Sequence, residues 1–135
     1  MLPALATDPE VRVVMVTGAG GAFCAGGDVK GMNDANRAGT ARAGYAAGTD
    51  DRVAQLRIWQ RAVSLGLHQM PKPVVAALPG AAAGAGLSIA LAADIRLAAE
   101  RAVLVTAFAN VGASGDFGGS WLLTQLVGPG SEGSW

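Results

Sequence analysis

Short apolar runs divide the chain into segments that predict β-strands. Residues 11–17, VRVVMVT, are nearly all β-branched or apolar and predict a buried strand. Residues 74–78 predict a second strand, 95–98 a third, and 103–106 a further short extended piece. Runs of this length without polar alternation are typical of strands that are covered on both faces.

Helical spacing is clearest over residues 50–70, where Pro71 ends the predicted helix. Its apolar positions recur every three or four residues and form one stripe, made of Val53, Leu56, Trp59, Val63 and Leu67. Further helices are predicted over 84–93 and 121–127. Because strands alternate with helices, we expect an α/β fold with a mainly parallel sheet. Strands 11–17 and 74–78 should share that sheet, with helix 50–69 packed across it.

Composition and charge argue against several classes of protein. Apolar residues make up 51% and charged residues 15% of 135 residues, which is typical of a globular core. The formal net charge of zero gives no electrostatic argument for nucleic acid, and no apolar run is long enough to span a membrane. The first residues lack the pattern of a signal peptide, so we expect a cytoplasmic protein. One cysteine and one histidine predict neither a disulfide framework nor a metal site.

Two glycine-rich turns indicate a reaction at a carbonyl group. Residues 22–28, AFCAGGD, and 80–86, GAAAGAG, each follow an apolar run. Small residues there leave backbone N–H groups bare, and two such groups brought together form an oxyanion hole for a carbonyl oxygen. The alternative is that both turns only allow tight packing between helix and sheet.

These residues resemble a known family. Residues 13–32 resemble the first signature of the crotonase (enoyl-CoA hydratase/isomerase) superfamily, and 71–77 with 80–96 resemble the second. The resemblance implies a crotonase-like ββα spiral core that binds acyl-CoA thioesters, with coenzyme A as part of the substrate and no other cofactor. The resemblance runs from about residue 8 to about residue 128. We expect residues 1–128 to form a partial acyl-CoA-binding domain without the family's C-terminal helical region, followed by an irregular tail, 129–135. A full-length member is expected to be a trimer-based homo-oligomer.

The resemblance also assigns site residues. It implies that the N–H groups of Gly27 and Ala85 form the oxyanion hole, although the family usually has glycine at position 85. Residues of the same two turns are implied in substrate binding: Ala25, Gly26, Asp28 and Gly84. Asp28 and Lys30 are expected either near the adenine or phosphates of coenzyme A or as solvated loop charges.

The hydratase glutamates are absent. Ser88 and Phe108 occupy their positions as pocket residues, and neither can act as the acid or base that adds water. Asp116 matches an aspartate of isomerase-type members, where it would move a proton between carbons of the acyl chain. Aromatic neighbours would raise its pKa; the alternative is that Asp116 caps the helix that begins near Gly119 or Ser120. Two functions remain, an acyl-CoA double-bond isomerase and a non-catalytic acyl-CoA-binding or interaction remnant.

Overall fold

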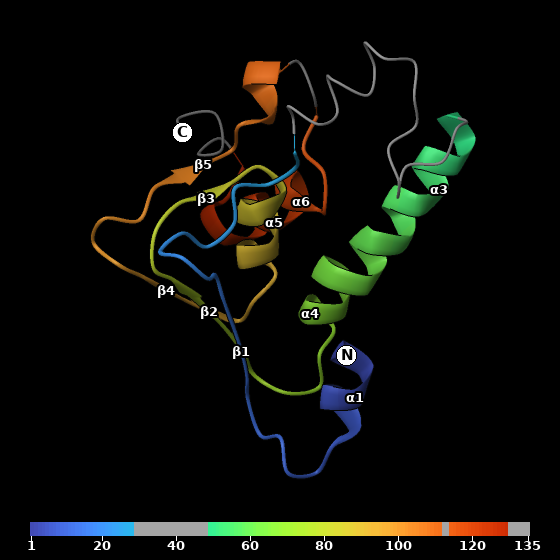
Figure 1. Ribbon diagram of the computed structural model, residues 1–135, viewed down its shortest axis with the longest axis vertical. Coiled ribbons are helices and arrows are strands. Elements are labelled where there is room, and N and C mark those ends of the chain that lie inside the picture. Colours follow the sequence, from blue (N-terminus) through green and yellow to red (C-terminus); the bar gives the residue numbers. More distant parts are fainter. Residues whose placement is uncertain (29–48, 112–113, 130–135) are drawn as a thin grey trace.

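A three-stranded parallel sheet forms the centre of the fold (Figure 1). The computed structural model describes residues 1–28, 49–111 and 114–129. The strands are β1 (Val14–Thr17), β2 (Val74–Leu78) and β4 (Ile95–Ala98), in the order β1-β2-β4. Val14 pairs with Val74, and Val75 pairs with Ile95. The predicted parallel pairing of the first two strands is confirmed.

A smaller sheet joins three distant segments. Strands β3 (Ala82–Ala83) and β5 (Leu104–Val105) are parallel, and Cys24 forms a parallel bridge with Ala82 on the other side of β3. The N–H of Phe23 donates to the Ala81 carbonyl at 2.9 Å, and that of Ala83 donates to the Cys24 carbonyl at 2.9 Å. These bonds bring the two glycine-rich turns side by side.

Helices cover the sheets and complete the core. Helix α5 (Ala85–Leu91) packs against α6 (Gly119–Val127), and α1 (Leu2–Thr7) packs near the end of the long helical segment. The 3-10 helix η2 spans Phe108–Val111. The buried core takes residues from both sheets and from these helices, including Val74, Ala76, Leu78, Leu87, Ala90 and Leu122.

The long helical segment is only partly buried. It consists of α3 (Thr49–Gln60), the π-helix η1 (Arg61–Leu65) and α4 (Gly66–His68). Leu67 is 4% exposed, whereas Val53, Leu56 and Trp59 are 43%, 40% and 40% exposed. Figure 1 shows α3 extending away from the sheets, while η1 contacts α5 and α4 contacts α1. The expected packing across the sheet is therefore wrong for α3, because none of the other described elements covers its apolar stripe.

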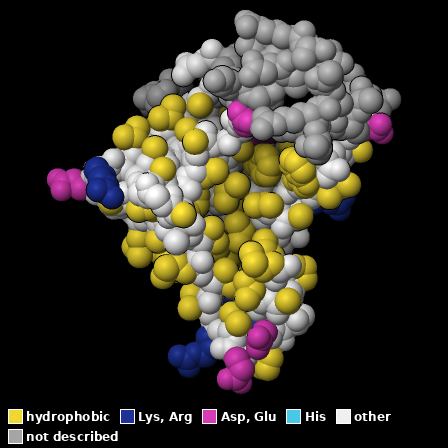
Figure 2. All heavy atoms as spheres, in the orientation of Figure 1, with side chains coloured by type: hydrophobic (Ala, Val, Ile, Leu, Met, Phe, Trp, Pro, Cys, Tyr) yellow, Lys and Arg dark blue, Asp and Glu magenta, His cyan; other side chains and the backbone are white. Residues whose placement is uncertain are grey.

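Apolar side chains are also exposed on the outer strands of the larger sheet. Val13 and Met15 lie at β1, and Ile95 and Leu97 lie on β4, all at least half exposed. Hydrophobic side chains spread over much of the face in Figure 2. No described helix is both long and apolar enough to cross a membrane.

The predicted bounds agree with the structure for β2 and β4 and differ by one to three residues for the other predicted elements. Strands β2 and β4 have the predicted ends, and α5 begins one residue after the predicted start. Strand β1 begins at Val14 rather than Val11, because the pairing with the next segment starts where the Val14 N–H donates to the Pro73 carbonyl at 2.9 Å. Helix α6 begins at Gly119, two residues early.

Candidate functional site

The two glycine-rich turns meet at the start of α5. Gly26 has φ +86° and Gly84 has φ +53°, a backbone region that other residues rarely adopt. A Cβ atom added to Gly26 would lie 2.7 Å from the Ala83 carbonyl oxygen and 3.5 Å from the Ala85 nitrogen. The loop at Gly26 therefore passes directly beside the first residue of α5, and only glycine allows this approach.

The predicted oxyanion donors lie on these neighbouring segments. Ala85 is the first residue of α5, where a backbone N–H has no acceptor within the helix, and Gly84 supplies no side-chain cap. Gly27 directly follows Gly26. Within the described part of the chain, no hydrogen bond is found from the N–H of Gly27 or of Ala85. Their convergence on one oxygen atom stays a prediction.

A cavity of about 390 Å³ opens between α5 and α6. Four of its lining side chains are apolar, four carry hydroxyl groups, and none is charged: Leu87, Ser88, Leu91, Thr106, Phe108, Gly115, Gly119, Ser120, Leu123 and Thr124. Both pocket residues that the sequence predicted, Ser88 and Phe108, line this cavity. Gly27, Ala85 and Asp116 do not line it.

The inner wall of the cavity is tightly packed around Phe108 and Ser88. Cβ atoms added to Gly84, Gly115 and Gly119 would lie 3.9, 3.5 and 3.5 Å from atoms of the Phe108 ring. Ser88 is fully buried, and its Oγ donates to the Gly84 carbonyl at 3.4 Å. The glycines thus leave the room that the aromatic ring and the hydroxyl occupy.

Asp116 carries a buried and unsatisfied carboxyl oxygen. Its Oδ1 is buried and finds no hydrogen-bond partner among the described residues. Burial raises the pKa of the Asp116 carboxyl, and a hydrogen bond from its own backbone lowers that pKa by less. The alternative role as a helix cap is wrong, because Gly118 is the N-cap of α6 and no side chain caps it.

Two strained turns hold Phe108 and Asp116. The Phe108 N–H donates to the Thr106 carbonyl at 2.6 Å across Ala107, whose φ is +54°, which forms a γ-turn. The Gly119 N–H donates to the Asp116 carbonyl at 2.9 Å across Phe117 and Gly118, whose φ values are +50° and +76°. Two successive positive φ values define a type I′ turn. A left-handed non-glycine residue costs on the order of 1–3 kcal/mol.

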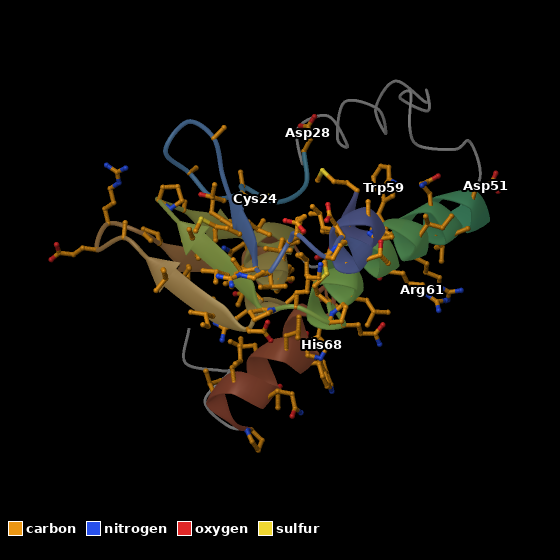
Figure 3. All side chains as sticks on the ribbon, turned by 90° about the horizontal axis from the view of Figure 1, so that it is seen from below. Cys24, Asp28, Asp51, Trp59, Arg61 and His68 are labelled. Carbon is orange, nitrogen blue, oxygen red and sulfur yellow. The ribbon has the colours of Figure 1, made fainter. Side chains whose placement is uncertain are left out.

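The remaining candidates lie at the edge of the site. Ala25 and Asp28 are exposed, and Asp28 stands at the end of the first turn, away from the core (Figure 3). Lys30 lies outside the described residues. His68 is the last residue of α4, and its ring meets that of Trp121 edge-on at 5.3 Å between centroids. No group of histidine, cysteine or acidic residues suited to a metal ion occurs in the described ranges.

Asp94 and Arg96, at the end of the second signature, have a structural role that the sequence analysis missed. Asp94 Oδ2 accepts a hydrogen bond from the Val74 N–H at 2.8 Å. The Arg96 guanidinium donates to carbonyls at the end of α5, those of Leu91 at 3.3 Å and of Ala93. Charged donors at a helix C-terminus satisfy carbonyls that have no partner within the helix. These two residues fix α5 against β2 and thereby place Ala85 and Ser88.

Comparison with known proteins gives a consistent result. A family model described as enoyl-CoA hydratase/isomerase matches residues 1–131. Among curated relatives, the probable enoyl-CoA hydratase EchA14 of Mycobacterium tuberculosis is 39% identical, and the 1,2-epoxyphenylacetyl-CoA isomerase of Escherichia coli is 40% identical; each match covers 90% of this chain and 43% of the relative. A crystal structure of an enoyl-CoA hydratase from Polaromonas is 38% identical with a TM-score of 0.77, covering 98% of this chain and 48% of that one.

The match extends over almost all of the chain, while the chain spans less than half the length of these relatives. The parallel sheets, the glycine-rich turns and the helix that begins at Ala85 are all within the matched residues. The chain belongs to the enoyl-CoA hydratase/isomerase family of the crotonase superfamily.

Proposed function

We propose that the protein moves a double bond within an enoyl-CoA thioester, with Asp116 as the residue that carries the proton. The observation that carries this proposal is the buried Oδ1 of Asp116, which has no hydrogen-bond partner among the described residues. In addition, the resemblance places the two glutamates of hydratases at Ser88 and Phe108. One curated relative, 36% identical over 123 residues, is by name a trans-2-decenoyl-[acyl-carrier-protein] isomerase, which supports the same reaction class.

In this mechanism the thioester oxygen accepts hydrogen bonds from the N–H groups of Gly27 and Ala85. Removal of a proton from the acyl chain then places negative charge on that oxygen, and fixed donors stabilise the resulting enolate. Both donors belong to the backbone, so the alanine at position 85 serves as well as the family's usual glycine. Coenzyme A enters as part of the substrate, and the mechanism needs no other cofactor.

Asp116 takes the proton from one carbon and returns it to another. Burial raises the pKa of its carboxyl, which makes the ionised form a stronger base. The same proton leaves and rejoins the substrate, so the double bond moves and nothing else is consumed. Hydration requires a second acid or base to activate water, and neither Ser88 nor Phe108 supplies one. We therefore expect very slow hydration of crotonyl-CoA.

The test is the Asp116→Asn variant, assayed for isomerisation of a panel of enoyl-CoA thioesters and for thioester affinity. The amide keeps the size of the side chain and removes the base. Isomerisation should be abolished while affinity changes little. An Asn variant that isomerises as fast as the wild type would show that the base lies elsewhere, and rapid hydration of crotonyl-CoA would contradict the proposed reaction class.

A second candidate is an acyl-CoA-binding protein without turnover. The observations that favour it are a cavity whose lining, among the described residues, has no charged side chain and does not include Asp116, and the exposed apolar faces of α3 and the larger sheet. Saturable thioester binding by the wild type without turnover of any member of the panel would favour this candidate. We expect a trimer-based homo-oligomer for a full-length member, and the mass of such a full-length protein in solution tests this.

A further inference from the structure

Two left-handed residues lie next to Phe108, which lines the cavity, and Asp116, the proposed base. In the described segments, Ala107 and Phe117 are the non-glycine residues with positive φ. Ala107 directly precedes Phe108, and Phe117 directly follows Asp116. Strained backbone of this kind persists only where the surrounding structure enforces it, and it gathers at functional sites. The two positions therefore invite a functional explanation.

Phe117 is the more unusual of the two. It occupies the first central position of the type I′ turn that the hydrogen bond from Gly119 to Asp116 closes. Glycine, asparagine and aspartate are the residues that this position favours, because they adopt positive φ at little cost. A bulky aromatic residue there is an outlier. The turn does not need this side chain, so the reason for it lies outside the turn.

The neighbouring carboxyl supplies that reason. Asp116 is half-buried, yet its Oδ1 has almost no accessible surface and no partner among the described residues. Phe117 is itself half-buried and comes next in the chain. The following residue, Gly118, has no side chain and is exposed, so it gives the carboxyl no cover. An aromatic side chain attached at this turn is well placed to cover an adjacent carboxyl group.

We propose that Phe117 is a positioning residue for Asp116: its left-handed turn directs the carboxyl inward, and its ring keeps water away from Oδ1. This inference rests on the proposed function, in which Asp116 is the base of the isomerase. A desolvated carboxylate is more reactive towards a carbon-bound proton than a hydrated one, because no bound water must be removed first. The strained backbone at Phe117 is thus explained by the more reactive, desolvated carboxylate that it gives Asp116.

The test is a carbon-13 NMR titration of the Asp116 carboxyl carbon. Its signal is identified as the one that disappears in the Asp116→Asn variant. Phe117→Gly and Phe117→Asn relieve the left-handed strain and remove the ring, so both variants should fold. In both, the titration midpoint of Asp116 should fall towards the ordinary aspartate value. Phe117→Leu retains an apolar side chain and should keep most of the raised midpoint. Ala107→Gly, which relieves strain at the other turn, should leave it unchanged.

Activity gives a second readout. Phe117→Gly should lower kcat for isomerisation on the order of 10- to 100-fold, with little change in KM, because the base is misplaced rather than removed. An unchanged Asp116 midpoint in both the Gly and Asn variants would overturn the inference, and so would an unchanged kcat in both. The titration requires no turnover, so its result is separate from the outcome of Asp116→Asn, which tests the proposed function itself.

Discussion

Ser88 and Gly119 are packed so closely that a Cβ atom on the glycine would lie 2.3 Å from the Ser88 Oγ. The contact joins α5 to the first residue of α6 at the wall of the cavity. The Ser88 hydroxyl therefore fits only because Gly119 has no side chain. This contact sets the distance at which α5 and α6 pack.

Gly119→Ala should destabilise the fold by about 1–3 kcal/mol, the usual cost of overpacking a close contact. Chemical denaturation measures the free energy of unfolding. Adding Ser88→Ala removes the Oγ and should recover part of the loss, so the two changes should be non-additive. Gly66→Ala is the matched control, because its Cβ meets only ordinary contacts at 3.5 Å inside a helix and should stabilise. Additive effects of the 88 and 119 substitutions would contradict direct packing.

Gly26→Ala and Gly20→Ala separate crowding from backbone strain. Both glycines have positive φ, but nothing lies within 4 Å of a Cβ at Gly20, whereas one at Gly26 lies 2.7 Å from the Ala83 carbonyl oxygen. Gly20→Ala should cost only the strain of a left-handed residue, about 1–2 kcal/mol. Gly26→Ala should cost more and should also weaken binding of an acyl-CoA thioester. Equal losses of stability and unchanged thioester affinity would show that the loop does not pack on α5.

Gly27→Pro removes one proposed oxyanion donor. Loss of a single donor of this kind typically lowers kcat 10²- to 10³-fold, and we expect a loss of that order for isomerisation. Gly27→Ala keeps the N–H and serves as the control, with activity much closer to the wild type. The comparison uses initial rates at saturating thioester. A proline variant with wild-type turnover would place the oxyanion hole elsewhere.

The raised pKa of Asp116 predicts opposite effects of pH on stability and on rate. Below the ordinary aspartate pKa both folded and unfolded chains are protonated, so burial of the carboxyl costs nothing there. As pH rises through the ordinary pKa to the raised folded value, the unfolded state ionises first and stability is lost. Asp116→Asn should therefore be more stable than the wild type at neutral pH, and the difference should vanish in acid.

The rate should change in the other direction, because only the ionised carboxylate acts as a base. Isomerisation should rise with pH through the raised pKa of Asp116. The two measurements are thermal unfolding and kcat/KM against pH. A wild type and an Asn variant with the same pH dependence of unfolding would show that this carboxyl is not buried in solution.

The sequence predicted strands well where local signals agree. β-branched residues and the preceding Pro73 define β2, so its bounds were predicted without error. The exposure of the long helix was not predicted. The spacing of Val53, Leu56 and Trp59 shows that they share one face of the helix, but it does not identify a segment that covers this face. Packing partners are set by the tertiary fold, and none of the described segments covers that face.

The candidate site was predicted in part. Both turns allow a close backbone approach, since a Cβ atom on Gly26 would lie 2.7 Å from the Ala83 carbonyl oxygen and one on Gly86 would lie 2.3 Å from the Cys24 carbonyl oxygen. The convergence of the Gly27 and Ala85 N–H groups stays a prediction. The left-handed turn at Phe117 left no trace in the sequence, because phenylalanine is among the residues least expected at positive φ. The sequence led us to expect that aromatic neighbours raise the pKa of Asp116, and in the structure burial raises it. That Oδ1 is the buried oxygen, without a partner among the described residues, is visible only in three dimensions.

The order of the strands has a consequence for the folding rate. Thr17 Oγ1 donates to the Ala77 carbonyl across 60 residues of sequence, and the parallel pairing of β1 with β2 spans the same separation. Contacts between such distant residues form slowly, because closing a long loop loses chain entropy before any bond compensates. The hydrogen bonds that join the first glycine-rich turn to Ala81 and Ala83 close a loop of similar length. We therefore expect the proposed thioester site to be among the last parts of the chain to acquire its native form.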